Sequence, residues 1–294
     1  TYGRTTSLLN CDSQLIFFTN GNLRSGTDSL LAANTHNTTF VVEADENHYF
    51  VYVFNFDSLG QSIFTRQNRL NQVKLTYDTN FNLLSVSRTQ LLNEYISDYV
   101  IAKKASGSGY WFIVTRPVDE ELLVYSWENG QLSPQYVDSL RLRNINPFQI
   151  PFPQRNTPDL IINAQGNKIC ISRKPVILAP SGSPERVSSF VEFDTQTGNL
   201  HNEMQIDWTN TALGTGVGAF LFSPNGNTFF TYSYIGNPAL YQLDLTVFDS
   251  IQATNSFTHL MNISMGNSPT YYVLAAYANE TDIALIAAIP HITG

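Results

Sequence analysis

Charged residues are scarce in this sequence. They make up 14% of its 294 residues, and only 16 of them are Lys or Arg; an average soluble domain is about 25% charged. A formal net charge of −8 with so few cations argues against nucleic acid and anionic membranes as partners, because both bind concentrated Lys and Arg. Disorder is excluded as well, because 43% of the residues are hydrophobic.

Long hydrophobic runs and cysteines are also rare. The longest apolar run, Ile283–Ile289, is far shorter than the roughly 20 residues of a membrane-spanning helix. The chain starts at Thr1 without a leader pattern, so we expect residues 1–294 to be a single domain excised or processed from a larger chain. Two cysteines, Cys11 and Cys170, exclude a disulfide framework and a CxxC metal site, and leave two buried thiols or one bridge as alternatives.

Short apolar or alternating runs, bounded by turn residues, recur from end to end, whereas helical periodicity is nearly absent. This pattern predicts about fifteen strands and no helix. Six tight turns each join two such runs, with marker residues Asp12, Glu46, Gly107, Gly166, Gly226 and Glu280. Four of the five intervals between the markers cluster near about 58 residues, which indicates an internal repeat.

A second hairpin follows several of these turns, with its own turn at Asp78–Asn80, Glu128–Gly130 or Thr195–Gly198. Two hairpins per period make a four-stranded antiparallel unit, and such units arranged radially form a β-propeller. The sequence therefore predicts an all-β propeller of six or seven blades, with seven favoured. A β-sandwich is the alternative, but its turns lack a repeat of this length.

Several strand and turn segments resemble one propeller family. Residues 14–21, QLIFFTNG, are similar to its NLLFYTDG signature, and Tyr49–Phe54 and Gly109–Thr115 resemble its YYIFT and DYWVVTH strands. Ala219–Asn227 is similar to MKFSPDGK, and Leu240–Leu245 to LYQFDL. The family is the seven-bladed, WD40/YVTN-like propeller of secreted and cell-surface Bacteroidetes proteins, many of them exported by the type IX route.

This resemblance implies an extracellular or cell-surface propeller and supplies no catalytic residues. It spans about residues 4–290, but the family's opening segment is missing and no His follows Thr115. The expected partner is a protein or a glycan, or other domains of the same precursor, without nucleic acid and without membrane insertion.

Patterns that suggest chemistry are weak throughout. Gly214, Gly216 and Gly218 lead into an apolar strand rather than a helix, unlike a dinucleotide site. The spacing of Asp78, Asn80 and Asn82 resembles a calcium loop, but Leu83 stands where that loop needs Gly, so a plain turn is favoured. The five histidines lack metal-binding spacing, and the acidic run Asp119–Glu121 reads as solvated charge. We therefore expect no catalytic residue, no metal and no cofactor.

The connections between blades carry the candidate binding residues. The segment from Arg141 to Pro158 is long and rich in proline, arginine and phenylalanine, and long ordered loops tend to be functional. Trp208 lies on another connection beside polar side chains, where an exposed ring suits sugar or protein contact; filling a gap between blades is the alternative. The candidate ligand- or partner-binding residues are Arg141, Arg143, Phe148, Arg155, Asp207, Trp208 and Asn210.

These observations favour a non-catalytic binding or structural module, with contacts to a protein, a glycan or copies of itself. The alternative is a propeller hydrolase, lactonase-like or a glycosidase, whose acidic residues converge at the channel mouth. Such carboxylates can be far apart in the sequence, so no local motif would reveal them.

Overall fold

The computed structural model describes residues 7–9, 15–19, 22–25, 30–32, 36–59, 67–92, 96, 98–116, 121–142, 159–172, 187–208, 217–233, 239–262, 272–278 and 283–288. The chain divides into two compact units. We call residues 1–97 with 127–134 the first unit, and residues 98–126 with 135–294 the second unit. The predicted single domain over the whole chain stays a prediction.

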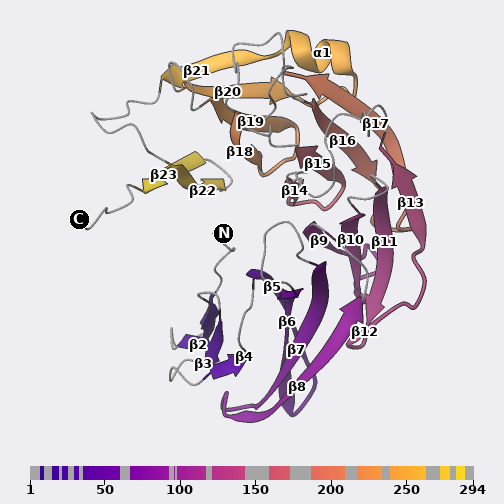
Figure 1. Cartoon of the computed structure of the whole chain (residues 1–294), viewed down its shortest axis with the longest axis vertical. Coiled ribbons are helices and arrows are strands. Elements are labelled where there is room, and N and C mark those ends of the chain that lie inside the picture. The colour runs from indigo at the N-terminus through magenta and orange to yellow at the C-terminus, as the bar shows by residue number, and fades with distance from the viewer. Residues whose placement is uncertain are drawn as a thin grey trace. The chain divides into compact units, whose positions relative to one another are not determined.

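The first unit contains two four-stranded antiparallel sheets in which consecutive strands are neighbours (Figure 1). The end of β11 and strand β12 (Gln131–Leu132) also belong to it. One sheet consists of β1 (Ser7–Leu9), β2 (Leu15–Thr19), β3 (Leu23–Ser25) and β4 (Leu30–Ala32). The other consists of β5 (His36–Ala44), β6 (His48–Leu59), β7 (Gln67–Asp78) and β8 (Leu83–Leu92).

The second unit is built in the same way. Strands β9 (Asp98–Lys103), β10 (Tyr110–Arg116), β11 (Glu121–Glu128) and β13 (Asp138–Arg141) form a sheet that β12 extends. Next come β14 (Asp159–Ile162), β15 (Lys168–Ser172), β16 (Val187–Phe193) and β17 (Leu200–Asp207). The last elements are β18 (Val217–Phe222), β19 (Thr228–Ser233), β20 (Ala239–Asp244), β21 (Thr258–Asn262), and the pair β22 (Tyr272–Ala278) and β23 (Ile283–Ala288).

The predicted all-β class and the four-stranded antiparallel unit are confirmed. The described residues form six sheets, whereas the blade count of six or seven stays a prediction. The described chain has 23 strands rather than about fifteen, because strands of two or three residues are too short to produce a periodic pattern.

The expectation of no helix is wrong by one element. Helix α1 (Ser250–Asn255) begins where the Asp249 carboxylate accepts hydrogen bonds from the backbone N–H groups of Ile251 (3.0 Å) and Gln252 (2.9 Å). Six residues give fewer than two turns, so no helical period emerges in the sequence. No helix within the described ranges is long and apolar enough to span a membrane.

Three turns of the second unit share one backbone geometry, and they are the turns that define the repeat. In the segments 104–109, 163–168 and 223–228, the first residue's N–H bonds to the carbonyl of the sixth, and the fourth residue's N–H bonds to the carbonyl of the first. The fourth residue is Gly107, Gly166 or Gly226, with φ of 85°, 74° and 68°. Glycine adopts this left-handed conformation without a steric penalty, so the repeat read from the sequence marks equivalent turns.

Gly198 combines such a conformation with a close contact. Its φ is 82°, and a Cβ there would lie 2.8 Å from the Trp111 ring. Gly198→Ala is expected to lower the free energy of unfolding by about 2–4 kcal/mol, since overpacking adds to backbone strain. The matched control is Gly107→Ala, whose φ is 85° with nothing within 4 Å. Equal losses in denaturant titrations of the two variants would contradict the role of the Trp111 contact.

The core of the first unit lies between its two sheets. Val51, Val53, Val73 and Leu75 on one face of the β5–β8 sheet are almost fully buried against Ile16, Leu23 and their neighbours. The opposite face packs on the end of β11, where the Trp127 ring meets Tyr52 and Phe54 edge to face and its Nε1 donates to Gln72 Oε1 (2.9 Å). Both faces of this sheet are therefore buried, as in stacked blades.

Tyr77 in this core gives a pH-dependent prediction. Burial raises the pKa of Tyr77 to about 12, and its buried hydroxyl has no hydrogen-bond partner in the described part of the chain. Tyr77→Phe is expected to raise the free energy of unfolding by about 1 kcal/mol at neutral pH, because it removes an unsatisfied polar group. Above pH 10 the unfolded chain loses this proton first, so wild-type stability falls between about pH 10 and 12. The variant loses less stability across that window; parallel alkaline titrations that coincide would rule this out.

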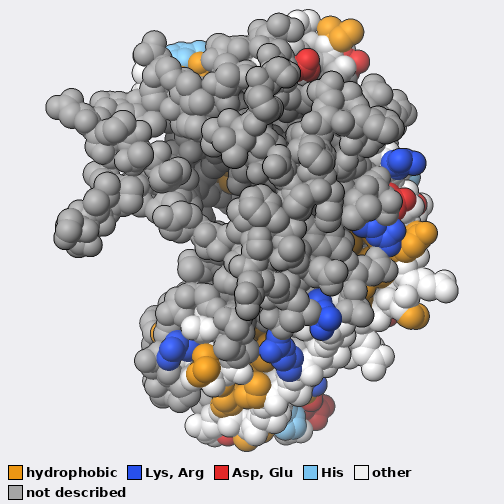
Figure 2. Space-filling view, viewed as in Figure 1, with side chains coloured by type: hydrophobic (Ala, Val, Ile, Leu, Met, Phe, Trp, Pro, Cys, Tyr) orange, Lys and Arg blue, Asp and Glu red, His pale blue; other side chains and the backbone are white. Residues whose placement is uncertain are grey.

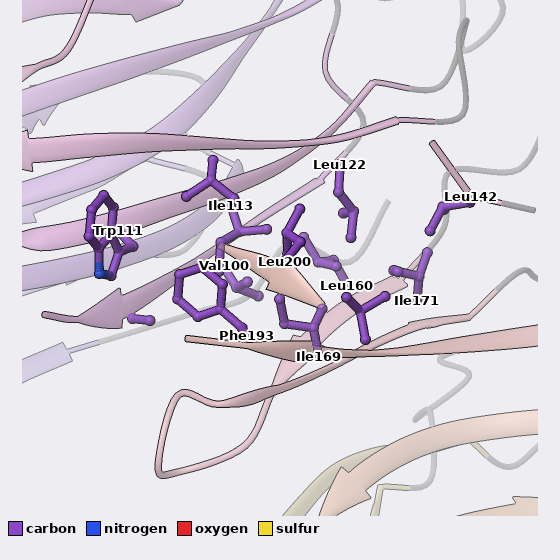
Figure 3. Close-up of a cluster of buried hydrophobic side chains, with 13 residues drawn as sticks. Val100, Trp111, Ile113, Leu122, Leu142, Leu160, Ile169, Ile171, Phe193 and Leu200 are labelled. Carbon is purple, nitrogen blue, oxygen red and sulfur yellow. The ribbon is translucent and has the colours of Figure 1, made fainter. Parts of the chain in front are cut away.

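Two hydrophobic clusters hold the sheets of the second unit together. Figure 3 shows the first, in which Trp111, Ile113 and Leu122 face Ile169 and residues of the next sheet. The second cluster joins the β14–β17 sheet to the β18–β21 sheet and includes Phe190, Trp208, Phe229 and Ala253 of α1. Sheets that bury both faces in this way explain why their strands are apolar on both sides.

Candidate functional site

The structure describes three of the seven predicted binding residues. Arg141 is exposed at the end of β13, opposite Glu121, and Asp207 is exposed at the end of β17. Arg143, Phe148, Arg155 and Asn210 lie outside the described residues. The predicted binding surface on the connections between blades therefore stays a prediction.

The expectation of an exposed ring at Trp208 is wrong. Trp208 is 1% exposed, and its Nε1 donates a hydrogen bond to Ser188 Oγ (2.9 Å). Its ring lies 5.8 Å from that of Phe257, which stacks on Tyr241 at 4.9 Å. Trp208 thus fills the space between two sheets, which was the alternative interpretation, because the second sheet and the segment after α1 cover it.

The buried charged groups of the second unit bind backbone groups of neighbouring sheets. Asp98 is 4% exposed, and its carboxylate accepts hydrogen bonds from the N–H groups of Tyr99 (2.9 Å) and Leu160 (2.9 Å). The Lys168 ammonium donates to the carbonyls of Leu245 (2.8 Å) and Gly226 (3.2 Å). Burial lowers the pKa of Lys168, and nearby carboxylates only partly oppose this shift. Sequence reading missed both residues because their partners lie about 60 positions away.

The turns with metal-like or acidic sequences are closed by their own hydrogen bonds. Asp78 Oδ1 accepts from the N–H groups of Asn80 (2.9 Å) and Asn82 (2.8 Å), and these bonds with the Asn82 side chain lower the pKa of Asp78. The prediction of a plain turn is confirmed there. Glu121 of the predicted acidic run lies 3.4 Å from Arg116. Within the ranges that the structure describes, no group of three or more His, Cys, Asp or Glu is placed to hold a metal ion.

One surface of the first unit stands out by its exposure. Strand β8 closes its sheet, and every side chain from Leu83 to Gln90 is exposed, including Leu84 at 56% and Val86 at 43%. Among the described residues β8 pairs only with β7. We call the outer side of residues 83–90 the β8 edge. Figure 2 shows hydrophobic side chains at the surface, beside Lys and Arg, over the part of the view that holds β6 to β8.

A half-buried cation lies on the neighbouring strand. Lys74 Nζ is 4.2 Å from the centre of the Phe50 ring and 5.5 Å from that of Tyr52. Burial raises the pKa of Glu43, which the charge of Lys74 partly opposes. This cluster orders the sheet face beside the β8 edge, and its pieces were not visible as a motif because they come from three strands.

Comparisons with known proteins identify the fold and no family. No family model matches the chain, and no curated protein matches it. The solved structures it resembles include the N-terminal domain of Nup159, at 11% identity and a TM-score of 0.50, with 96% of this chain and 72% of that chain covered.

Two further solved structures resemble the chain over most of its length. One is the WD40 domain of SCAP from fission yeast, at 11% identity and a TM-score of 0.43, covering 96% of this chain and 81% of that chain. The other is a candidate 6-phosphogluconolactonase from Bacteroides fragilis, at 10% identity and 0.40, covering 96% and 86%. The chain is an all-β protein whose four-stranded antiparallel sheets match β-propeller structures.

Proposed function

We propose that this protein is a non-catalytic binding or structural module whose contacts to other molecules are made by exposed edges and loops of the sheets. The observation that carries the proposal is the β8 edge, where eight consecutive side chains are exposed and several of them are apolar. An edge strand presents unpaired N–H and C=O groups that can accept an extended segment of a partner protein.

The use of the buried ionisable groups supports the same proposal. Asp98 and Lys168 bind backbone atoms of the next sheet and so stabilise the scaffold. Reacting groups would instead need to converge on a site that a substrate can reach. A rigid framework of sheets with variable connections suits recognition, with the framework fixing the loops that contact the partner.

The proposed setting is the outside of the cell. The low charge and the resemblance to propellers of secreted and cell-surface Bacteroidetes proteins support it, and the proposed partner is a protein, a glycan or a further domain of the same precursor. Arg141 and Asp207, both exposed, remain candidate contacts beside the β8 edge.

The test measures binding and turnover on the same purified chain. A library of extended peptides and a glycan array are screened for binding, while lactone and glycoside substrates are assayed for hydrolysis. We expect specific binding without hydrolysis, and we expect Leu84→Lys to weaken peptide binding at the β8 edge by about tenfold. Ile251→Lys is the matched control, because Ile251 is also exposed and apolar, at 70%, but lies on α1. Hydrolysis with no binding in either screen would reject the proposal.

A further inference from the structure

The β8 edge lacks the devices that normally keep an edge strand from pairing. Natural edge strands are short, carry charged residues or proline, or are interrupted by bulges. Strand β8 has ten residues, with Arg88 as its one charged residue and no proline. Its register with β7 shifts only near the two ends, between Thr76 and Tyr77 and between Leu70 and Asn71, so the stretch between is regular.

The strands that close the other four-stranded sheets do carry such devices. Strand β4 has three residues and β21 has five. Strand β17 is as long as many central strands, but it carries Glu203 and Asp207, has Asn202 at a φ of 40°, and shifts register beside Glu192. The β8 edge is therefore the closing edge best suited to accept a further strand.

The sequence of β8 also matches itself when it is read in reverse. In an antiparallel pair of two β8 strands related by a two-fold axis, each residue lies opposite a residue of similar type, as a closed symmetric interface requires. Leucines face leucines at the ends, and polar or β-branched residues face each other in the middle. The opposed pairs are Leu83 with Leu92, Leu84 with Leu91, Ser85 with Gln90, Val86 with Thr89, and Ser87 with Arg88.

The charge on the strand fits this register. Arg88 lies opposite the neutral Ser87 of the second copy, and because residues 87 and 88 point to opposite faces, the two arginines lie on opposite faces of the joined sheet. Like charges placed directly opposite would destabilise the pair. We infer that a second copy of this chain is the occupant of the β8 edge, which joins two four-stranded sheets into one eight-stranded sheet. The inference rests on the proposed function and specifies its partner.

The test exchanges charges across the inferred register in the full chain. Val86 and Thr89 are exposed, lie on opposite faces of their own strand, and oppose each other only between copies. The double variant Val86→Lys/Thr89→Glu places two opposite-charge pairs across the interface, and Val86→Lys/Thr89→Lys places two like-charge pairs. Analytical ultracentrifugation is expected to show a dimer that is weaker in the second variant by roughly tenfold or more, with a smaller difference at high salt.

The control Val86→Lys/Ser108→Glu carries the same formal charges as the first variant but places its carboxylate in an exposed turn of the second unit. We expect its dimer affinity to lie between those of the other two, and hydrogen exchange to show β8 amides protected only in the dimer. A chain that stays monomeric, or a dimer indifferent to residue 89, would overturn the inference. Peptide or glycan binding by such a chain would leave the proposed function standing, whereas its failure in both screens would remove both.

Discussion

Asp98→Ala is expected to lower the free energy of unfolding by about 3–5 kcal/mol, among the largest effects of any single substitution in the second unit. The Asp98 carboxylate is buried and accepts hydrogen bonds from Tyr99 N–H and from Leu160 N–H, which lies 62 residues away on the next sheet. Alanine leaves both buried donors without their acceptor, and each bond to a charged group contributes about 1.5–3 kcal/mol. Denaturant titration with hydrogen exchange at Leu160 would measure the loss.

The matched control for this prediction is Asp138→Ala. Asp138 makes the equivalent bond across the same separation, since its Oδ2 accepts from Leu200 N–H at 2.7 Å, but it is only partly buried. Water can reach the donors that this variant leaves, so the expected loss is about 1–2 kcal/mol. If Asp98→Ala cost no more than Asp138→Ala, burial of the carboxylate would not be what makes the first bond important.

The repeated turns show what could be predicted from the sequence. A turn with a left-handed residue is a local feature, so Gly107, Gly166 and Gly226 mark equivalent places before any coordinates are known. Their spacing of 59 and 60 residues then implies repeated units, because neighbouring sheets bury apolar faces only by stacking. Fold class followed from these local signals alone.

Contacts between sheets could not be predicted in the same way. Trp111 Nε1 donates to the carbonyl of Thr195, which lies 84 residues further along, and Trp127 Nε1 donates to Gln72, which lies 55 residues before it. Each bond depends on how two sheets are packed, and nothing in the neighbouring sequence records that packing. The exposure of β8 is also a tertiary property, although its lack of acidic residues, lysine and proline was a signal that sequence reading could have used.

Trp208 shows how a candidate site residue can be misassigned for this reason. Beside Asp207 and a polar segment, its sequence context is typical of an exposed connection. In the structure it lies in a cluster with Phe190 and Phe229, which two sheets and Ala253 of α1 enclose. An aromatic residue at the end of a strand can face solvent or the next sheet, and the choice is made by the neighbour.

Trp208→Ala is therefore expected to act on stability, lowering the free energy of unfolding by about 3–5 kcal/mol, because it leaves a large cavity between two sheets. Trp208→Phe keeps a ring against Phe257 and loses mainly the bond to Ser188, so it should cost less. Ser188→Ala, which removes the same bond from the other side, should cost about 1–3 kcal/mol by leaving the indole N–H unsatisfied. Denaturant titrations of the three variants measure this order. If Trp208→Ala kept wild-type stability but lost binding to a glycan or peptide, Trp208 would be a contact residue after all, and the packing of these two sheets would need another explanation.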